Sequence, residues 1–257
     1  MLCFALLAHQ DEKALLQQIR NIRKYNGHHV KIVLYNGGKN PNFGKKVCKT
    51  ANVMYCPHSR PLAWGKTGRS HYDVMRWLEE NKVKYDYLAV LDSDVLFVRG
   101  GLEKWLEKQL NGYDCVLPVF RHETAPETTT WTPGTTMWKE WSRWKPFFNS
   151  SHFYGTFNPL QVYRHGIIRS MLARIDKSKL ERLLRDTKVF ALDEMIYITT
   201  AVLCGGRCKE YPKAVTQYLR PYPRISLEEA KAAKRNPAVM FVHPVKDGAV
   251  WKWICEQ

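Results

Sequence analysis

The first 118 residues alternate between short apolar runs and stretches in which apolar residues recur every three to four positions. The apolar runs predict strands at residues 2–8, 28–38, 51–56, 85–92 and 113–118. The periodic stretches predict helices at residues 11–24 and 69–80 and near 101–110. Strands that alternate with helices in this way favour an α/β fold whose mostly parallel central sheet is flanked by helices on both faces.

The second half of the chain is less regular. Residues 119–152 are rich in Thr, Pro and Trp and show no clear period, so we expect a long functional or mobile loop there. Asn158 followed by Pro159 has the residue types of a helix start, which predicts a helix to about residue 174. Further helices are expected near Asp193 and after the capping-box pattern "SLEE", and "AVMFVHP" predicts a late strand.

Composition and charge describe a globular, strongly basic protein. The chain has 257 residues, 45% of them hydrophobic, which is enough for one buried core and argues against disorder. Its formal net charge of +16 attracts anions of any kind. The basic residues are spread along the chain and form no recognisable nucleic-acid module, so we expect a solvated basic surface and no nucleic-acid partner.

Targeting and redox signals are weak. The first apolar run is about seven residues long and lacks a basic leader and a cleavage site, so it predicts a core strand and neither a signal peptide nor a bilayer span. The seven cysteines are odd in number and lack the spacing of a zinc site. These features favour reduced thiols and a cytoplasmic location.

The strand in "YDYLAVLDSDVLFV" runs into two aspartates, Asp92 and Asp94. Ligands of parallel sheets collect at the carboxyl ends of the strands, which is where this pair lies. Side chains two apart on an extended strand share a face, so their charges would repel unless a cation lies beside them. A hard divalent ion suits such oxygen ligands and would in turn bind a diphosphate, whereas the alternative is a solvated strand-end turn.

An apolar strand followed by "DSD" resembles the GT-A class of nucleotide-sugar glycosyltransferases, whose DxD motif holds a divalent metal against the sugar-nucleotide diphosphate. The N-terminal "FALLAHQDEKALLQQIRNI" and the later "LDEMIYITT" look most like core-2 branching and xylosyltransferase enzymes. The resemblance implies a single GT-A, Rossmann-like domain over residues 1–257. Its nucleotide-sugar-binding half would be residues 1–118 and its acceptor-binding half residues 119–257.

The resemblance also implies residues that bind the nucleotide sugar. Ala8 and His9 end the first strand and would lie against the nucleotide, together with Asp92. In "WGKTGRSHYDVMRWL", a segment that lies along the nucleotide in relatives, Lys66 and Arg69 would contact the phosphates. The alternative for these two is that they are ordinary surface cations.

The C-terminal "FVHPVKDG" is similar to the segment whose histidine closes the metal shell in many GT-A enzymes. His243 would therefore join Asp92 and Asp94 in binding Mn²⁺ or Mg²⁺, and Lys246 would meet the diphosphate as a point charge. A structural histidine beside a strand is the competing interpretation.

In "FALDEMIYITTAVL", an acidic pair opens a predicted helix. Asp193 alone could serve as an N-cap. Glu194 corresponds to the acid that, in inverting GT-A enzymes, deprotonates the acceptor hydroxyl. The resemblance therefore implies that Glu194 and Asp193 are catalytic and slightly favours inversion.

Two further stretches leave alternatives open. Trp138, Trp141 and Trp144 are spaced by threes and, with Trp131, either pack in the core or line an acceptor loop. The basic amphipathic stretch "KSKLERLLRDTKVF" predicts either a solvated helix or one that rests on an anionic membrane as a peripheral contact.

The expected activity is metal-dependent transfer of a sugar from a nucleoside-diphosphate sugar, with a UDP-sugar favoured, to a hydroxyl of a glycan or lipid-linked acceptor. Such a reaction belongs to glycan or cell-surface polysaccharide synthesis. One alternative is a haloacid-dehalogenase-like phosphatase that uses Asp92 and Asp94, although its motif would normally lie on the first strand of the core. A second is a non-catalytic basic protein that binds glycan or nucleic acid.

Overall fold

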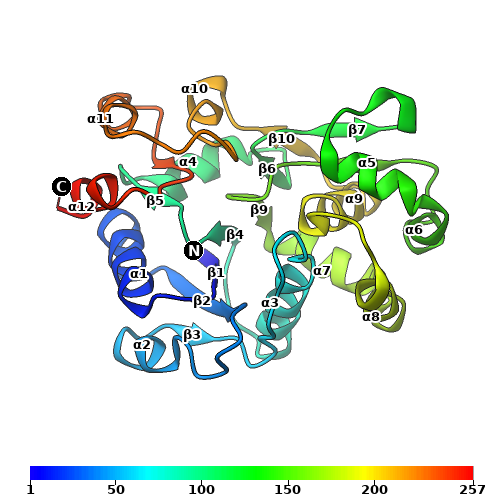
Figure 1. Ribbon diagram of the computed structural model, residues 1–257, viewed down its shortest axis with the longest axis horizontal. Coiled ribbons are helices and arrows are strands. Elements are labelled where there is room, and N and C mark those ends of the chain that lie inside the picture. Colours follow the sequence, from blue (N-terminus) through cyan, green and yellow to red (C-terminus); the bar gives the residue numbers. More distant parts are fainter. Residues whose placement is uncertain (257) are drawn as a thin grey trace.

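A computed structural model, which describes residues 1–256, shows a central seven-stranded sheet with helices on both sides (Figure 1). The order of its strands is β10-β6-β9-β4-β1-β2-β3. The strands are β1 (Leu2–Ala8), β2 (Lys31–Asn36), β3 (Met54–Tyr55), β4 (Tyr87–Asp92), β6 (Cys115–Leu117), β9 (Val162–Arg164) and β10 (Cys208–Glu210).

The sheet is parallel except for β9. β1 pairs in parallel with β2 and with β4, and Leu7 of β1 lies opposite Asp92 of β4. β9 is antiparallel to both of its neighbours, β4 and β6. These findings confirm the predicted α/β class and its mostly parallel sheet. Because β2 and β3 extend the sheet on one side of β1 and β4 on the other, the loops diverge where β1 and β4 end, which is where α/β sheets bind ligands.

Both faces of the sheet are buried, as the continuous apolar runs predict. On β1, Phe4 and Leu6 belong to one core cluster and Cys3 and Ala5 to another. The first cluster includes residues of α1 (Glu12–Asn26), α2 (Lys45–Thr50) and α4 (Leu102–Gln109). The second includes residues of α3 (Arg69–Glu80), α7 (His165–Arg174) and α9 (Ile196–Leu203). Figure 1 shows α1 and α3 on opposite sides of the central strands.

The C-terminal segment folds back onto the turn that follows β4. β11 (Phe241–Val242) pairs antiparallel with β5 (Leu96–Phe97), so that Val242 lies opposite Leu96. A third apolar cluster holds this pair against α11 (Leu227–Arg235) and α12 (Gly248–Glu256). The capping box predicted from "SLEE" is present at the start of α11, which confirms that prediction. The pairing brings the residues after β11 beside the aspartate turn.

The prediction of a long loop over residues 119–152 is wrong. This segment contains β7 (Arg121–Glu123), the 3₁₀ turn η1 (Pro126–Thr128), α5 (Thr132–Lys139) and α6 (Trp141–Phe148). β7 pairs with β8 (Phe153–Gly155) in a small antiparallel sheet. The apolar residues of this segment pack in the second core cluster, and local periodicity in the sequence does not reveal such tertiary packing.

The tryptophans of α5 and α6 lie in the core. Trp144 is fully buried, and Trp138 and Trp141 pack against the second cluster, with ring centroids 5.0 and 5.1 Å from that of Phe153. These tryptophans come from two helices, since α5 ends at Lys139 and α6 begins at Trp141. The core-packing alternative therefore holds for them.

The helix predicted from Asn158 to residue 174 is wrong in its first half. Residues 162–164 form β9, and the helix α7 begins only at His165. The N-cap of α7 is Arg164, and the Asn158 side chain instead donates a hydrogen bond to Asp92 at the end of the neighbouring strand β4.

The basic amphipathic stretch forms α8 (Lys177–Asp186). Its leucines face the protein, since Leu180 is buried and Leu183 and Leu184 pack against the second core cluster. Its outward face carries exposed charged residues and not a free apolar stripe. Within residues 1–256, none of the helices is both long enough and apolar enough to span a bilayer.

Candidate active site

The two aspartates converge through a tight turn and not through an extended strand. Asp92 is the last residue of β4, Ser93 and Asp94 form the turn, and the Val95 N–H donates to the Asp92 carbonyl at 3.2 Å. Gln18 of α1 donates from Nε2 to the carbonyls of Asp92 at 2.8 Å and Val95 at 3.1 Å. The buried glutamine therefore holds the backbone of this turn against the sheet.

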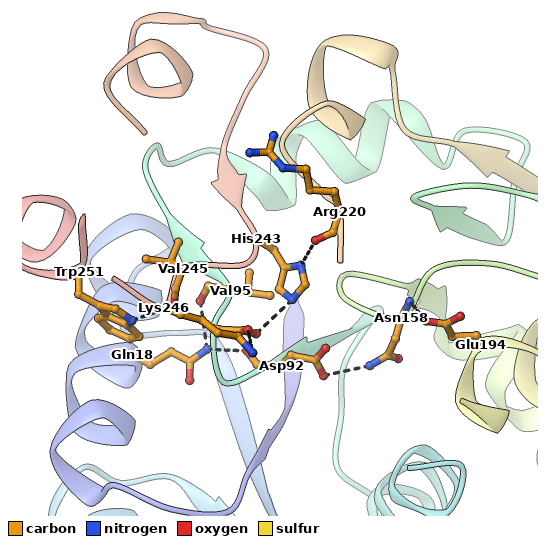
Figure 2. A network of polar contacts seen from close by, with 11 residues as sticks. Gln18, Asp92, Val95, Asn158, Glu194, Arg220, His243, Val245, Lys246 and Trp251 are labelled. Carbon is orange, nitrogen blue, oxygen red and sulfur yellow. Dashed lines mark hydrogen bonds and ion pairs between the residues drawn. The ribbon is translucent and has the colours of Figure 1, made fainter. Parts of the chain in front are cut away.

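His243 directly follows β11 and reaches the same turn. The Val245 N–H donates to the Asp94 carbonyl at 2.9 Å, which fixes the two backbones side by side. The His243 ring lies with Nδ1 3.0 Å from the carbonyl oxygen of Arg220 (Figure 2). Its Nε2 lies 3.1 Å from Asp94 Oδ1. A metal-binding histidine commonly donates one ring N–H to a carbonyl while the other nitrogen faces the ion. The Arg220 contact orients His243 in this way.

Asp92, Asp94 and His243, hereafter the Asp-Asp-His group, each offer a ligand atom within 4.8 Å of the other two. Desolvation and the neighbouring charge of Asp94 raise the pKa of Asp92 to about 7. Asp94 is desolvated too, but His243 and Lys246 outweigh that and lower its pKa. Crowded carboxylates with an oriented imidazole fit a divalent cation, which would relieve their repulsion.

Lys246 supplies a further positive charge at this place. Its Nζ lies 3.4 Å from Asp94 Oδ2, and its side chain is half exposed. It lines the same cavity as the Asp-Asp-His group, so its ammonium can reach an anion bound there.

Asn158 links the Asp-Asp-His group to the acidic pair predicted in the sequence. Its Nδ2 donates to Asp92 Oδ1 at 2.9 Å, and its backbone N–H donates to Glu194 Oε1 at 3.3 Å. Gln161 donates from Nε2 to Asn158 Oδ1 at 3.2 Å and to the Asp193 carbonyl at 3.2 Å. Sequence reasoning missed this role, because an asparagine before a proline signals a turn or cap and says nothing about a distant partner.

Asp193 and Glu194 lie in the 3₁₀ turn η2 (Leu192–Glu194) and both line the cavity. The N-cap of α9 is Met195, so the N-cap interpretation of Asp193 is wrong. Asp193 Oδ1 instead accepts a hydrogen bond from the Thr67 hydroxyl, and burial raises its pKa to about 6. Burial, helped by the charges of Asp193 and Asp92, raises the pKa of Glu194 well above its usual value. A carboxylate whose pKa is raised in this way is a stronger base in its deprotonated form.

The cavity that contains these groups has a volume of about 540 Å³ and opens where β1 and β4 end. His9 lines it directly after β1. Ala8 is buried, and its carbonyl accepts the N–H of Gly37, so it supports the wall without lining it. A volume of this size is within the range that small-molecule ligands occupy.

The rim of the cavity carries an aromatic pair that sequence reasoning also missed. Trp64 is 90% exposed, and its ring centroid lies 4.8 Å from that of Phe190. Gly65 permits this arrangement, since it has a φ of +68° and a Cβ there would lie 2.1 Å from the Phe190 ring. A tryptophan at so exposed a position contributes little to the core and presents a flat apolar surface beside the site.

Lys66 and Arg69 are not brought to the Asp-Asp-His group. Lys66 donates from Nζ to the carbonyls of Thr187 at 2.7 Å and Val189 at 3.4 Å. Arg69 binds the Glu181 carboxylate through two bonds of 2.5 and 2.6 Å. Both cations line a smaller neighbouring cavity, and of this segment Trp64, Gly65 and Thr67 line the larger one.

No protein-family model matches this chain, and no curated protein matches it either. Among solved structures, it is similar to the galactosyltransferase LgtC in complex with donor and acceptor sugar analogs. The two are 13% identical with a TM-score of 0.47, over 83% of this chain and 74% of that one. It is also similar to TarS of S. aureus, at 10% identity and a TM-score of 0.47, over 82% of this chain but 35% of that one.

A third similar structure is the bifunctional IspDF of Campylobacter jejuni, at 14% identity and a TM-score of 0.41, over 81% of this chain and 48% of that one. The chain thus spans about a third of TarS and about half of IspDF. At these identities and TM-scores the likenesses carry no argument about what this chain does.

Proposed function

We propose that the protein is a metal-dependent glycosyltransferase of the GT-A kind, which moves a sugar from a nucleoside-diphosphate sugar to an acceptor hydroxyl. One observation carries the proposal. The Asp-Asp-His group lies at the switch point between β1 and β4, in a cavity of about 540 Å³ that also contains Asp193 and Glu194. Departure of a diphosphate requires positive charge, which ligands for a cation can hold in place. Activation of a hydroxyl requires a base, and a carboxyl with a raised pKa can serve as one.

The donor side of the proposal follows from the switch point. A bound Mn²⁺ or Mg²⁺ would neutralise the diphosphate of the donor as the leaving group develops charge. Asp92, Asp94 and His243 would hold this ion, and Lys246 would add a point charge beside the diphosphate. His9, supported by Ala8, would lie against the nucleoside of the donor, and a UDP-sugar is the favoured donor.

The acceptor side depends on the acidic pair. Glu194 would take the proton of the attacking hydroxyl, and inversion at the sugar is favoured. Asp193, held by the Thr67 hydroxyl, would position η2 and help to keep the pKa of Glu194 high. General-base catalysis of this kind contributes about 10²- to 10⁴-fold to the rate.

The biological setting is proposed on the same basis. The acceptor would be a glycan or a lipid-linked sugar, used in glycan or cell-surface polysaccharide synthesis in the cytoplasm. Peripheral contact with an anionic membrane would rest on the exposed charges of α8 alone, because its leucines face the core. The acceptor-binding half would be residues 119–257 and the donor-binding half residues 1–118.

A thermal-shift panel tests the proposal. UDP-, GDP-, CMP- and dTDP-sugars are added with Mn²⁺ or with EDTA to the wild type and to Asp94→Asn. A ligand at about 100 times its Kd adds about 2.7 kcal/mol, which raises the Tm of a chain of this length by roughly 5–10 °C. We expect one nucleotide class to do so with Mn²⁺ only, and Asp94→Asn to abolish the shift. No shift with any donor, or one that persists in EDTA, would contradict the proposal.

A phosphatase assay separates the nearest alternative. The aspartate-nucleophile phosphatases would carry their motif on the first strand of the core, whereas Asp92 ends the fourth strand along this chain. Hydrolysis of an aryl phosphate that is lost in Asp92→Asn would favour that alternative. A non-catalytic nucleic-acid binder would instead show an affinity that falls steeply with salt and is independent of Mn²⁺.

A further inference from the structure

A second cavity, of about 530 Å³, adjoins the candidate active site. Phe157 and Pro221 line both cavities and form the wall between them. The remaining lining of the second cavity comes from the segment after β6 and the start of β7, from Trp131 just before α5, from the end of β10, and from α10 (Lys213–Thr216) and the residues that follow it. Nothing in the proposed donor site requires this second space.

The charges that line the second cavity are unequal. Arg220 is paired with Glu229 at 2.6 Å, and Glu210 accepts the Phe120 N–H at 2.6 Å. Arg121 and Lys213 are exposed, and within residues 1–256 neither makes an ion pair. The second cavity therefore offers two cationic side chains that form no ion pair with a carboxylate of the described chain, beside the single carboxylate of Glu210.

Arg121 is held in place by an aromatic surface. Its guanidinium lies over the Trp131 ring, 5.3 Å from the centroid. Trp131 packs closely on Gly155, where a Cβ would lie 2.4 Å from its ring. A guanidinium stacked in this way keeps its fork of donors free for a planar or tetrahedral anion.

Arg121 of the second cavity lies near enough to Glu194 of the first for its charge to act on that carboxyl. Burial raises the pKa of Glu194, and the charge of Arg121 is among the influences that lower it, so the guanidinium lies within electrostatic reach of the proposed base. The donor would fill the first cavity, so an acceptor whose hydroxyl reaches Glu194 must place the rest of its sugar chain in a space beside that cavity. The second cavity lies on the far side of Phe157 and Pro221 and offers that place.

We infer that the second cavity is the acceptor subsite, and that the acceptor carries an anionic group, a carboxylate or a phosphate, which Arg121 and Lys213 bind. This inference rests on the proposed glycosyltransferase function and specifies the substrate class of the same site. An uronic acid and a sugar phosphate share this chemistry, and the test separates them.

The inference is tested by measuring binding to immobilised oligosaccharides in the presence of Mn²⁺ and nucleoside diphosphate. The oligosaccharides form three matched sets: neutral, carboxylate-bearing and phosphate-bearing. The wild type is compared with Arg121→Gln/Lys213→Gln. Its matched control is Lys108→Gln/Arg182→Gln, which loses the same charge from exposed sites on α4 and α8 outside both cavities. A conservative variant, Arg121→Lys, keeps the charge and loses the fork.

We expect the wild type to retain one anionic set above the neutral set, and the cavity variant to bind that set on the order of tenfold more weakly. The control variant should stay within about twofold of wild type, and Arg121→Lys should fall between the two. The set that is retained identifies a carboxylate or a phosphate. Equal retention of neutral and anionic sets would overturn the inference, as would equal losses in the two double variants.

The wild-type thermal-shift panel keeps the two proposals distinct. A Mn²⁺-dependent donor shift without anion selectivity on the oligosaccharides would leave the glycosyltransferase proposal standing and reject the anionic acceptor. Anion selectivity that depends on Arg121 and Lys213, without any donor shift, would reject the donor site and retain the second cavity as an anion-binding site.

Discussion

Asn158 donates from Nδ2 to Oδ1 of Asp92 at 2.9 Å. The same residue donates its backbone N–H to Glu194 Oε1, so one asparagine spans the distance between a candidate metal ligand and the candidate base. Gln161 fixes the asparagine by donating to its Oδ1 at 3.2 Å. The two halves of the proposed chemistry are therefore positioned by one short segment between β8 and β9.

Replacement of Asn158 by Ala should weaken metal binding. Asp92 would lose the donor that orients its carboxylate, and loss of such an outer contact typically lowers metal affinity 10- to 100-fold. We expect a loss in this range for Mn²⁺, measured by calorimetric titration. Asn111→Ala, at an exposed position, is the matched control and should bind as wild type does. An unchanged Kd in Asn158→Ala would show that this contact does not act on the ion.

Two lysines are candidates for contact with the diphosphate, and their observed contacts favour one of them. Lys246 lies 3.4 Å from Asp94, whereas Lys66 is engaged by the carbonyls of Thr187 and Val189. Lys246→Gln should weaken nucleoside-diphosphate binding by about tenfold, with little effect on stability because the side chain is half exposed. Lys66→Gln should leave binding within about twofold and lower the free energy of unfolding by about 1 kcal/mol. Nucleotide titration and urea unfolding measure both, and the opposite ranking would restore the phosphate role that the sequence implies for Lys66.

Sequence reasoning succeeded where the signal was local. The run that forms β4 is apolar on both faces and ends at Asp92, so both the strand and its carboxyl end could be predicted. The capping box before α11 is likewise complete within four residues. The proximity of His243 to Asp94 was expected only through the family resemblance, and the β5–β11 pairing now explains it.

The failures concern residues whose partners are distant in the chain. Asn158 has the local features of a helix cap, but a carboxylate 66 positions earlier engages its side chain. Lys66 and Arg69 precede the motif in sequence, yet α8 and the segment that follows it bind them elsewhere. Residues 119–152 gain their structure from the second core cluster. Tertiary partners of this kind are not encoded in spacing or propensity.

His71 should make the protein acid-sensitive. It is buried on α3, its Nδ1 has no hydrogen-bond partner, and burial lowers its pKa to about 3. His71 takes up a proton near pH 6.5 in the unfolded chain and only near pH 3 in the folded chain. The free energy of unfolding therefore decreases as the pH falls from about 6.5 towards 3. Integrated from pH 7 to pH 5, the loss is about 2 kcal/mol.

His71→Gln should therefore lose about 2 kcal/mol less than the wild type when urea unfolding is compared at pH 7 and pH 5. The raised pKa values of Asp193 and Glu194 act in the opposite sense. These carboxyls bind protons more tightly in the folded chain, so they increase the free energy of unfolding as the pH falls. They are present in both proteins and largely cancel in the comparison. Equal losses in the two proteins would mean that His71 is protonated in the folded state at pH 5.

Glu194→Gln should abolish most of the transfer while leaving the donor bound. Loss of a general base lowers kcat by about 10²- to 10⁴-fold, and Mn²⁺-dependent donor affinity should stay within about threefold of wild type because Glu194 is not in the Asp-Asp-His group. Burial raises the pKa of Glu194, and a base acts when deprotonated, so wild-type transfer should rise as the pH increases through that raised pKa. The residual transfer of Glu194→Gln should lack this rising limb. Glu127→Gln, at an exposed position in η1, is the matched control and should keep both rate and profile. Transfer by Glu194→Gln within threefold of wild type, with the rising limb intact, would exclude Glu194 as the base.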